Sequence, residues 1–204
     1  VWANVWMSDV IVRIDPDNVV TVLCKHLEMG QGVTTGITTL VAEELGADWS
    51  RMRFEFAPND AKRFNNLAFG PVQGTGGSTA ILASFDQMRQ VGAAARIMFV
   101  QAAAARWGVP AGEITVENGV LRHGRSNRTA TFGELAGEAM RQPVPTKVTL
   151  KDPKDWVLIG KKLPRLDSVA KTNGTAVFAM DVKRPGMVTA MLQATEFIDV
   201  IVPR

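Results

Sequence analysis

The sequence of 204 residues is poor in the side chains from which metal and cluster sites are built. Cys24 is the only cysteine, which excludes a disulfide within the chain and a cluster held by about four thiolates of this chain. The only histidines are His26 and His123, and their number and spacing do not match a metal site. We therefore expect no metal ligands and no iron–sulfur cluster in these residues.

Long apolar runs and clusters of a single charge are also missing. No run of about 18 apolar residues occurs, so the sequence predicts no transmembrane segment. The net charge is +3, but the basic residues are scattered and not interleaved with aromatic residues, which argues against nucleic acid as a partner. Hydrophobic residues make up 46% of the chain, enough for a sizeable core in one domain or one and a half.

Hydrophobic periodicity predicts an irregular succession of strands and helices. Strands are expected at residues 10–14, 19–24, 52–57, 114–116 and 120–121, and helices at residues 35–45, 79–107 and 131–140. Residues 58–75 are expected to form a long loop without regular structure. This order predicts an α+β fold, in which a mixed sheet with hairpins packs on one long and two shorter helices.

Further expectations concern single residues of these helices. The long helix should pack against the sheet through four apolar side chains and bend at Gly92; the four are Phe85, Met88, Val91 and Met98. Ser78 is expected to cap this helix, and Thr131 and Glu134 to form a capping box at the last one.

The composition changes near residue 142, where prolines and lysines become frequent. We expect residues 1–146 to form the first domain, residues 147–163 a linker, and residues 164–204 the incomplete start of a second domain. Strands are expected there at residues 176–180 and 187–191. Because a lone hairpin is marginal in water, this region should lie against the first domain, pair with another chain or be disordered.

Two glycine-rich stretches stand where helices are expected to begin. The first is KHLEMGQGVTTG, residues 25–36, which contains Gly30, Gln31 and Gly32; the second is GTGGSTA, residues 74–80, which contains Gly76, Gly77, Ser78, Thr79 and Ala80. Glycine lets a ligand approach the backbone, and the first N–H groups of a helix lack partners and favour anions. Neither stretch matches the Walker pattern or the dinucleotide fingerprint.

Ordinary structural interpretations remain open for the same residues. Each stretch could be a tight turn or a turn followed by a helix cap. His26 is expected to be a packed or solvent-facing strand residue and Cys24 a small buried hydrophobic residue. Glu43 and Glu44 are expected on the solvated face of a helix or as caps of a neighbouring group, and not as a general acid and base.

Several stretches in order resemble the large subunit of molybdenum hydroxylases, the xanthine dehydrogenase and aldehyde oxidase superfamily. They are KHLEMGQGVTTGITTLVAEELGADW at residues 25–49, QGTGGSTAI at 73–81 and RQVGAAARIMFVQAAAARWGVP at 89–110. The resemblance is strongest to isoquinoline 1-oxidoreductase beta subunits and related bacterial molybdopterin-dependent aldehyde dehydrogenases. Residues 159–187, IGKKLPRLDSVAKTNGTAVFAMDVKRPGM, are similar to the start of that family's hammerhead domain.

The resemblance implies a binding role for both glycine-rich stretches. Gly30, Gln31 and Gly32 would contact the pterin of a molybdopterin cofactor, and the same cofactor would be lined by Gly76, Gly77, Ser78, Thr79 and Ala80. In bacterial members this cofactor usually carries a cytosine dinucleotide. The glutamate base of the family has no counterpart in these residues, so no catalytic residue is assigned and the isolated chain is expected to be inactive.

The resemblance also implies an activity and partners. It predicts part of an oxidoreductase that hydroxylates an aldehyde or N-heterocycle with water as the oxygen source. The partners would be an iron–sulfur small subunit, which carries the clusters, and the remainder of the large subunit. A bacterial periplasm or cytoplasm is expected, with the periplasm favoured.

Two other functions remain open from the sequence: a non-redox phosphate- or nucleotide-binding module, and a non-catalytic structural remnant of the enzyme. The chain begins with Val1 instead of Met, and after Leu192 it departs from the family. We therefore expect a processed or excised piece whose end is artificial, truncated or frameshifted.

Overall fold

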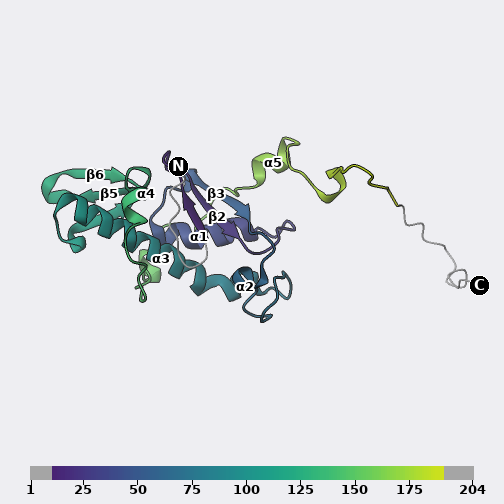
Figure 1. The fold of residues 1–204 in the computed structure, drawn as a ribbon, viewed down its shortest axis with the longest axis horizontal. Helices are drawn as coiled ribbons and strands as arrows, with labels where there is room; N and C mark the ends of the chain where they lie inside the picture. Colours follow the sequence, from purple (N-terminus) through teal and green to yellow (C-terminus); the bar gives the residue numbers. More distant parts are fainter. Residues whose placement is uncertain (1–10, 191–204) are drawn as a thin grey trace, which may run out of the picture. The chain divides into compact units, whose positions relative to one another are not determined.

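The computed structural model describes residues 11–190 (Figure 1). Contacts within the chain divide it into two compact units, with the boundary between Val169 and Ala170. The first unit is an α+β fold with a mixed sheet, as predicted. The domain limits expected from the sequence stay a prediction.

The first sheet has the strand order β1-β2-β3. Strand β1 (Val12–Ile14) is antiparallel to β2 (Val20–Cys24), whereas β2 is parallel to β3 (Met52–Phe56). A parallel pair needs a crossover, and helix α1 (Val33–Leu45) provides it. This crossover places residues 25–32 of the first glycine-rich stretch between the end of β2 and the start of α1, and residues 33–36 in the first turn of α1.

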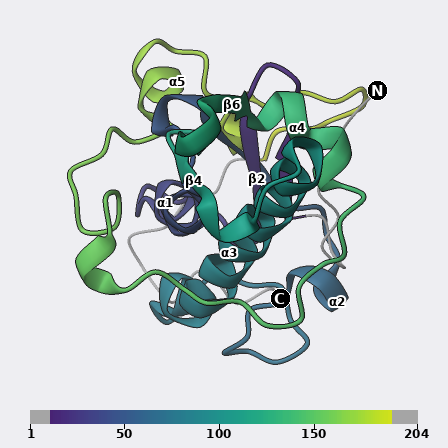
Figure 2. The same cartoon turned by 90° about the vertical axis from the view of Figure 1, so that its left-hand side faces the viewer.

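Helix α3 (Thr79–Trp107) has the limits that the sequence predicts. Met88, Val91 and Met98 are buried as expected, but α3 packs mainly on α1 instead of on the first sheet. Gly92 permits this crossing, because a Cβ atom there would lie 2.4 Å from the carbonyl oxygen of Val41. Figure 2 shows α1 and α4 on different sides of α3, and α3 contacts both.

The second sheet is antiparallel with the order β4-β5-β6. Its strands are β4 (Ile114–Glu117), β5 (Val120–His123) and β6 (Arg128–Thr131). Strand β6 was not expected, since it is polar and only its Ala130 is buried. Helix α4 (Phe132–Ala139) follows it directly and begins with the predicted capping box of Thr131 and Glu134.

The loop after β3 is more ordered than expected. It contains a short helix, α2 (Ala61–Phe64), which the side chain of Asp60 caps. The buried Asn66 side chain donates hydrogen bonds to the carbonyl oxygen of Gly74, at 3.2 Å, and to Thr79 Oγ1, at 2.8 Å. These bonds hold the loop against the start of α3.

Glu43 and Glu44 are not on a solvated helix face, as one expectation had it, because both side chains are buried. Glu43 Oε2 accepts the backbone N–H groups of Val157, Leu158 and Ile159 at 2.9, 2.6 and 3.2 Å. The alternative expectation, a cap of a neighbouring group, is therefore confirmed for Glu43. Through it the segment of residues 157–159 is attached to α1.

Short 3-10 turns complete the described elements: η1 (Trp49–Arg51), η2 (Ala111–Glu113), η3 (Gly124–Ser126), η4 (Pro153–Asp155) and η5 (Ala179–Asp181). Helix α5 (Ser168–Thr172) spans the boundary between the units. The prediction of a strand at residues 176–180 is wrong, because these residues form no strand. Residues 187–190, where the second strand was predicted, form no strand either. Val177, Met180 and Val188 are exposed, so no packed face stabilises strands there; Met191 lies outside the described residues.

Candidate functional site: two glycine corners at helix starts

The first glycine corner, which we define as residues 28–32, owes its shape to Gly30 and Gly32. Their φ angles are +103° and +85°, a backbone region that residues with a Cβ atom rarely adopt. Apart from Gly30 and its two chain neighbours, no residue within 11–190 has an atom within 4 Å of the place where a Cβ of Gly30 would stand. The glycine is thus required by backbone conformation, and the space beside it is open.

Glu28 was not singled out in the sequence, yet it organises this corner. Its carboxylate accepts the N–H groups of Gly30, Gly32 and Thr34 at 2.8, 2.9 and 3.2 Å, and the Thr34 hydroxyl at 3.0 Å. Burial alone would raise the pKa of Glu28, but the hydrogen bonds from Gly32 and Thr34 outweigh it and lower the pKa. The sequence signal that could have revealed the role of Glu28 is its position four residues before Gly32, the glycine at which α1 begins.

Gln31 is exposed and folds onto its own turn. Its Nε2 donates to the carbonyl oxygen of Leu27 at 2.8 Å, and its Oε1 accepts the N–H of Met29. A primary amide has two N–H donors and two acceptor lone pairs. Gln31 can therefore offer one donor and one lone pair to a ligand while both bonds to its own turn persist.

The second glycine corner, defined as residues 74–80, leaves the start of α3 open. Gly77 and Ser78 have φ angles of +58° and +56°. Ser78 stands at the N-cap position of α3, as expected, but its side chain makes no cap hydrogen bond. Capping requires an extended backbone, whereas that of Ser78 is left-handed. Thr79 Oγ1 instead donates to the carbonyl oxygen of Gly76 at 2.8 Å. No acidic residue occupies the first turn of α3.

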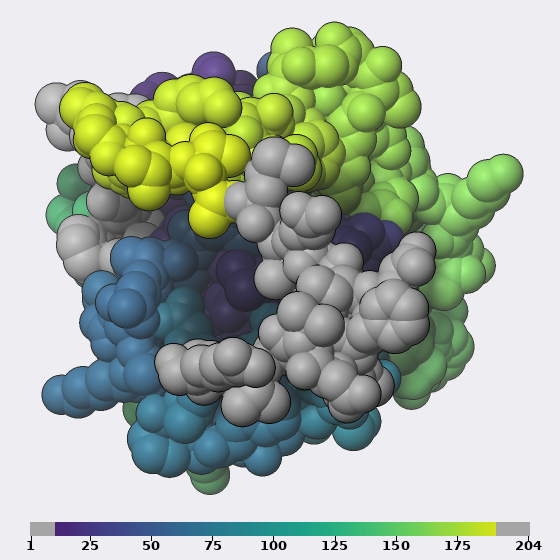
Figure 3. Space-filling view, turned by 90° about the vertical axis from the view of Figure 1, so that its right-hand side faces the viewer, coloured from purple at the N-terminus to yellow at the C-terminus, as the bar shows by residue number. Residues whose placement is uncertain are grey.

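The structure brings the two corners together. The N–H of Leu27 donates to Thr75 Oγ1 at 2.9 Å, and a Cβ on Gly36 would lie 2.9 Å from Cδ1 of Ile81. Figure 3 shows purple atoms of the N-terminal part of the chain beside blue atoms of the residues that follow β3. Two stretches that are about 45 residues apart in sequence thus form one surface.

Buried polar side chains lie beneath this surface. His26 places Nδ1 3.2 Å from the carbonyl oxygen of Gly74 and Nε2 3.1 Å from Ser84 Oγ, so it is the packed residue that one interpretation predicted. Lys25 Nζ donates to Gln87 Oε1 at 2.6 Å. Burial lowers the pKa of His26 and of Lys25, and it raises the pKa of Cys24 to about 11. Cys24 is therefore a buried thiol and not a nucleophile.

Large apolar side chains are exposed around the corners. Leu27, Met29 and Leu82 are 64, 70 and 79% exposed, and they are accompanied by Phe69, Val72 and Ile81. Exposed apolar groups gathered in one place are typical of surfaces that bind a partner or a ligand.

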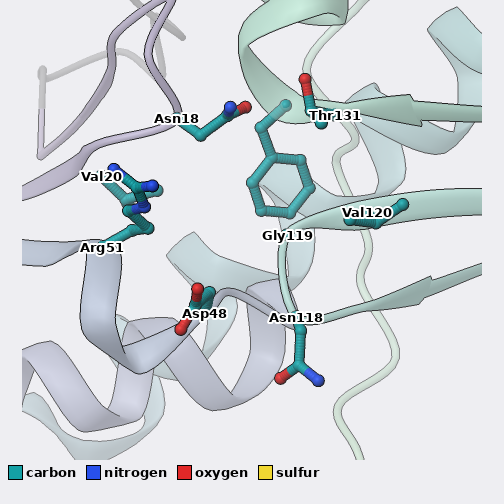
Figure 4. A pocket seen from close by; sticks show the side chains of 9 residues that line it. Asn18, Val20, Asp48, Arg51, Asn118, Gly119, Val120 and Thr131 are labelled. Atoms are coloured by element: carbon teal, nitrogen blue, oxygen red, sulfur yellow. The ribbon is translucent and has the colours of Figure 1, made fainter.

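A separate crevice of about 110 Å³ lies between the two sheets. Figure 4 shows Asn18, Asp48 and Arg51 on one side of it and Val120 and Thr131 on the other. None of the predicted site residues lines it. Within residues 11–190 no group of three His, Cys, Asp or Glu side chains could hold a metal ion, and no helix is long and apolar enough to cross a membrane.

Comparison with known families shows to which family the chain belongs. A model of the molybdopterin cofactor-binding domain matches residues 3–200. The chain belongs to the molybdopterin cofactor-binding domain family.

Curated proteins resemble this molybdopterin-binding domain over most of its length. The beta subunit of an isoquinoline 1-oxidoreductase from Brevundimonas diminuta is 37% identical, over 93% of this chain and 28% of that protein. A membrane-bound aldehyde dehydrogenase [pyrroloquinoline-quinone] from Gluconacetobacter polyoxogenes is 33% identical, over 90% and 23%. A subunit of nicotinate dehydrogenase from Pseudomonas putida is 28% identical, over 86% and 14%. The chain thus spans less than a third of these relatives, two of which are named as subunits.

The residues of the molybdopterin-binding domain suit such a cofactor. A pterin edge carries ring nitrogens and an amino group, which the remaining donor and lone pair of Gln31 could match beside the open Gly30. The uncapped start of α3 suits a phosphate. The start of α1 does not, because Glu28 already occupies its N–H groups.

Proposed function

We propose that this chain is part of a molybdopterin-dependent oxidoreductase that hydroxylates an aldehyde or N-heterocycle with water as the oxygen source. The observation that carries the proposal is the hydrogen bond from Leu27, which directly precedes the first corner, to Thr75 of the second, because it brings an exposed amide and an uncapped helix start to one surface. The bound cofactor would supply the redox centre of the reaction. The chain itself would bind and orient that cofactor.

The roles of the corners follow from their hydrogen bonds. Gly30, Gln31 and Gly32 would hold the pterin, because Gln31 keeps a free donor and lone pair there. The second corner would hold the phosphates of a cytosine dinucleotide form, and its residues are Gly76, Gly77, Ser78, Thr79 and Ala80. Glu28 supports the assignment of the phosphates to the second corner, because its negative charge at the first corner repels an anion.

Lys25 supports the placement of phosphate at the second corner. Its ammonium group is buried and donates to Asn65 O at 3.0 Å and to Gln87 Oε1, with no carboxylate among these acceptors. An uncompensated buried charge acts over a longer range than one in water. Because Gln87 belongs to α3, this charge would add to the positive end of the helix dipole that favours an anion at the second corner.

The partners belong to the same proposal. The remainder of the large subunit would cover the exposed apolar side chains around the corners, and an iron–sulfur small subunit would carry electrons away, since residues 11–190 contain no cluster ligands. The periplasm is the favoured compartment, by family resemblance.

A non-redox phosphate- or nucleotide-binding module is the second candidate, and the open start of α3 favours it. Cofactor extraction followed by mass analysis separates the two. The full-length protein that contains this chain would be purified with its small subunit from molybdenum-replete cells. We expect molybdopterin cytosine dinucleotide; a nucleotide without a pterin would support the second candidate, and pyrroloquinoline quinone would contradict both.

A further inference from the structure

Residues 164–167 return to the first glycine corner from far along the chain. The indole Nε1 of Trp49 donates to the carbonyl oxygen of Pro164 at 3.3 Å, and the N–H of Leu166 donates to Thr35 Oγ1 at 3.2 Å. Both contacts lie within the first unit. They hold the residue between Pro164 and Leu166 over the start of α1.

That residue is Arg165, and its guanidinium group binds the corner directly. Nη1 donates to the carbonyl oxygen of Gly30 at 3.0 Å, and Nη2 lies 3.4 Å from Glu28 Oε1. Asp167 accepts from Nε at 2.9 Å and from Nη2 at 2.7 Å, which fixes the plane of the guanidinium. The guanidinium also lies 3.9 Å from the position of a Cβ on Gly32.

As a result, Gly30 is held through both of its polar backbone groups. Glu28 accepts its N–H and Arg165 donates to its carbonyl oxygen. Glu28 Oε1 receives three groups, the N–H of Gly30, the N–H of Gly32 and Nη2 of Arg165. Because glycine has the largest conformational freedom of any residue, these bonds decide which shape the corner adopts.

We propose that Arg165 is a positioning residue for the first glycine corner, which it holds in its binding shape through Gly30 and Glu28. The part of this inference that concerns molybdopterin rests on the proposed function, whereas the control of the corner does not. The hydrogen bonds of Arg165 within residues 11–190 go to the first corner and to Asp167. Its loss therefore acts on the pterin side of the surface and leaves the start of α3 in place.

The first test is hydrogen exchange at the amides of Gly30 and Gly32, measured by NMR on the 204-residue chain. Arg165→Gln should accelerate exchange of both amides roughly twofold to fivefold, the range expected for a partly exposed ion pair. Arg165→Lys should have an intermediate effect, because lysine keeps the charge but lacks the planar fork. Unchanged exchange in Arg165→Gln would overturn the proposal.

Arg106→Gln is the matched control. Like Arg165, Arg106 is partly exposed and binds both a carbonyl oxygen, that of Glu134, and a carboxylate, that of Glu138, and it lies at the other end of α3 from the second corner. Its loss should leave exchange at Gly30 and Gly32 unchanged. Equal acceleration in both variants would show a general loss of stability and overturn the positioning role.

A second readout is the molybdopterin content of the full-length protein. At equal melting temperature, Arg165→Gln should contain less cofactor than Arg106→Gln, and Arg165→Lys should recover part of it. Equal contents would overturn the link between Arg165 and the cofactor. A wild-type protein without molybdopterin would overturn the proposed function, while the exchange experiment would still decide whether Arg165 holds the corner.

Discussion

Glu43 Oε2 accepts the backbone N–H of Leu158 at 2.6 Å, although 115 residues separate the two in sequence. The same carboxylate binds the Lys151 ammonium at 2.9 Å through Oε1. A buried glutamate thus serves as the anchor that keeps residues 151–159 on α1.

Replacement of Glu43 by Gln should destabilise the chain by about 2–3 kcal/mol, because several N–H groups lose a charged acceptor and Lys151 loses its partner. Urea unfolding followed by circular dichroism measures the free energy of unfolding. Glu117→Gln, at an exposed glutamate of β4, is the control and should change this free energy by less than about 0.5 kcal/mol. A similar effect of both variants would argue against the anchor.

The stability of the chain should fall at acidic pH in a way that depends on Glu43. Burial alone would raise the pKa of Glu43, but the N–H of Leu158 and the Lys151 side chain outweigh it and lower the pKa. The stabilisation is therefore complete above the unfolded-state pKa of about 4.3 and is lost as the pH falls through the lower folded-state pKa. Urea midpoints between about pH 7 and pH 3 should decline less steeply in Glu43→Gln than in the wild type.

Gly92→Ala should destabilise the chain by about 1–3 kcal/mol despite the better helix propensity of alanine, because its Cβ would meet the Val41 carbonyl oxygen. Gly137→Ala in α4 is the control, since no atom lies within 4 Å of a Cβ there. It should stabilise by about 0.5–1 kcal/mol. Thermal unfolding of both variants checks the opposite signs; a neutral Gly92→Ala would show that α1 and α3 can move apart.

Glu28→Ala should destabilise the chain by about 1 kcal/mol, the usual effect of a lost helix cap, because Gly32 and Thr34 lose their acceptor. Urea unfolding measures the effect. Glu117→Ala provides the comparison at an exposed site. An unchanged free energy of unfolding in Glu28→Ala would show that water replaces the carboxylate as the acceptor, and it would contradict this prediction.

Gln31→Ala should lower the molybdopterin content of the full-length protein while leaving the fold intact. A ligand-paired amide contributes roughly 1–3 kcal/mol to binding, so occupancy should fall at limiting cofactor. The molybdenum content and the melting temperature are measured together. Gln90→Ala, at an exposed glutamine of α3, should change neither. Unchanged metal content and turnover in Gln31→Ala would contradict the assignment.

Local signals made much of the fold predictable from the sequence. Helix α3 ends at Gly108, where φ is +65°, and α4 begins with the Thr131–Glu134 capping box, since both signals act within a few residues. The first glycine corner was also visible, because residues with a Cβ atom rarely adopt the φ angles of Gly30 and Gly32. Each of these signals depends only on interactions between residues a few positions apart in sequence.

Tertiary contacts decided the rest. Glu43 looks like a solvated helix residue until residues 157–159 bring their N–H groups to it, and Arg165 reaches Gly30 across 135 residues. The strand pattern of residues 176–180 failed for the converse reason, since no packed face is present to stabilise it. The sequence by itself therefore determined where the three longer helices and the glycine corners form, but not the short helices α2 and α5. Only the folded chain decided which charges are buried and what holds the corners, because burial and long-range hydrogen bonds depend on segments that no local pattern brings together.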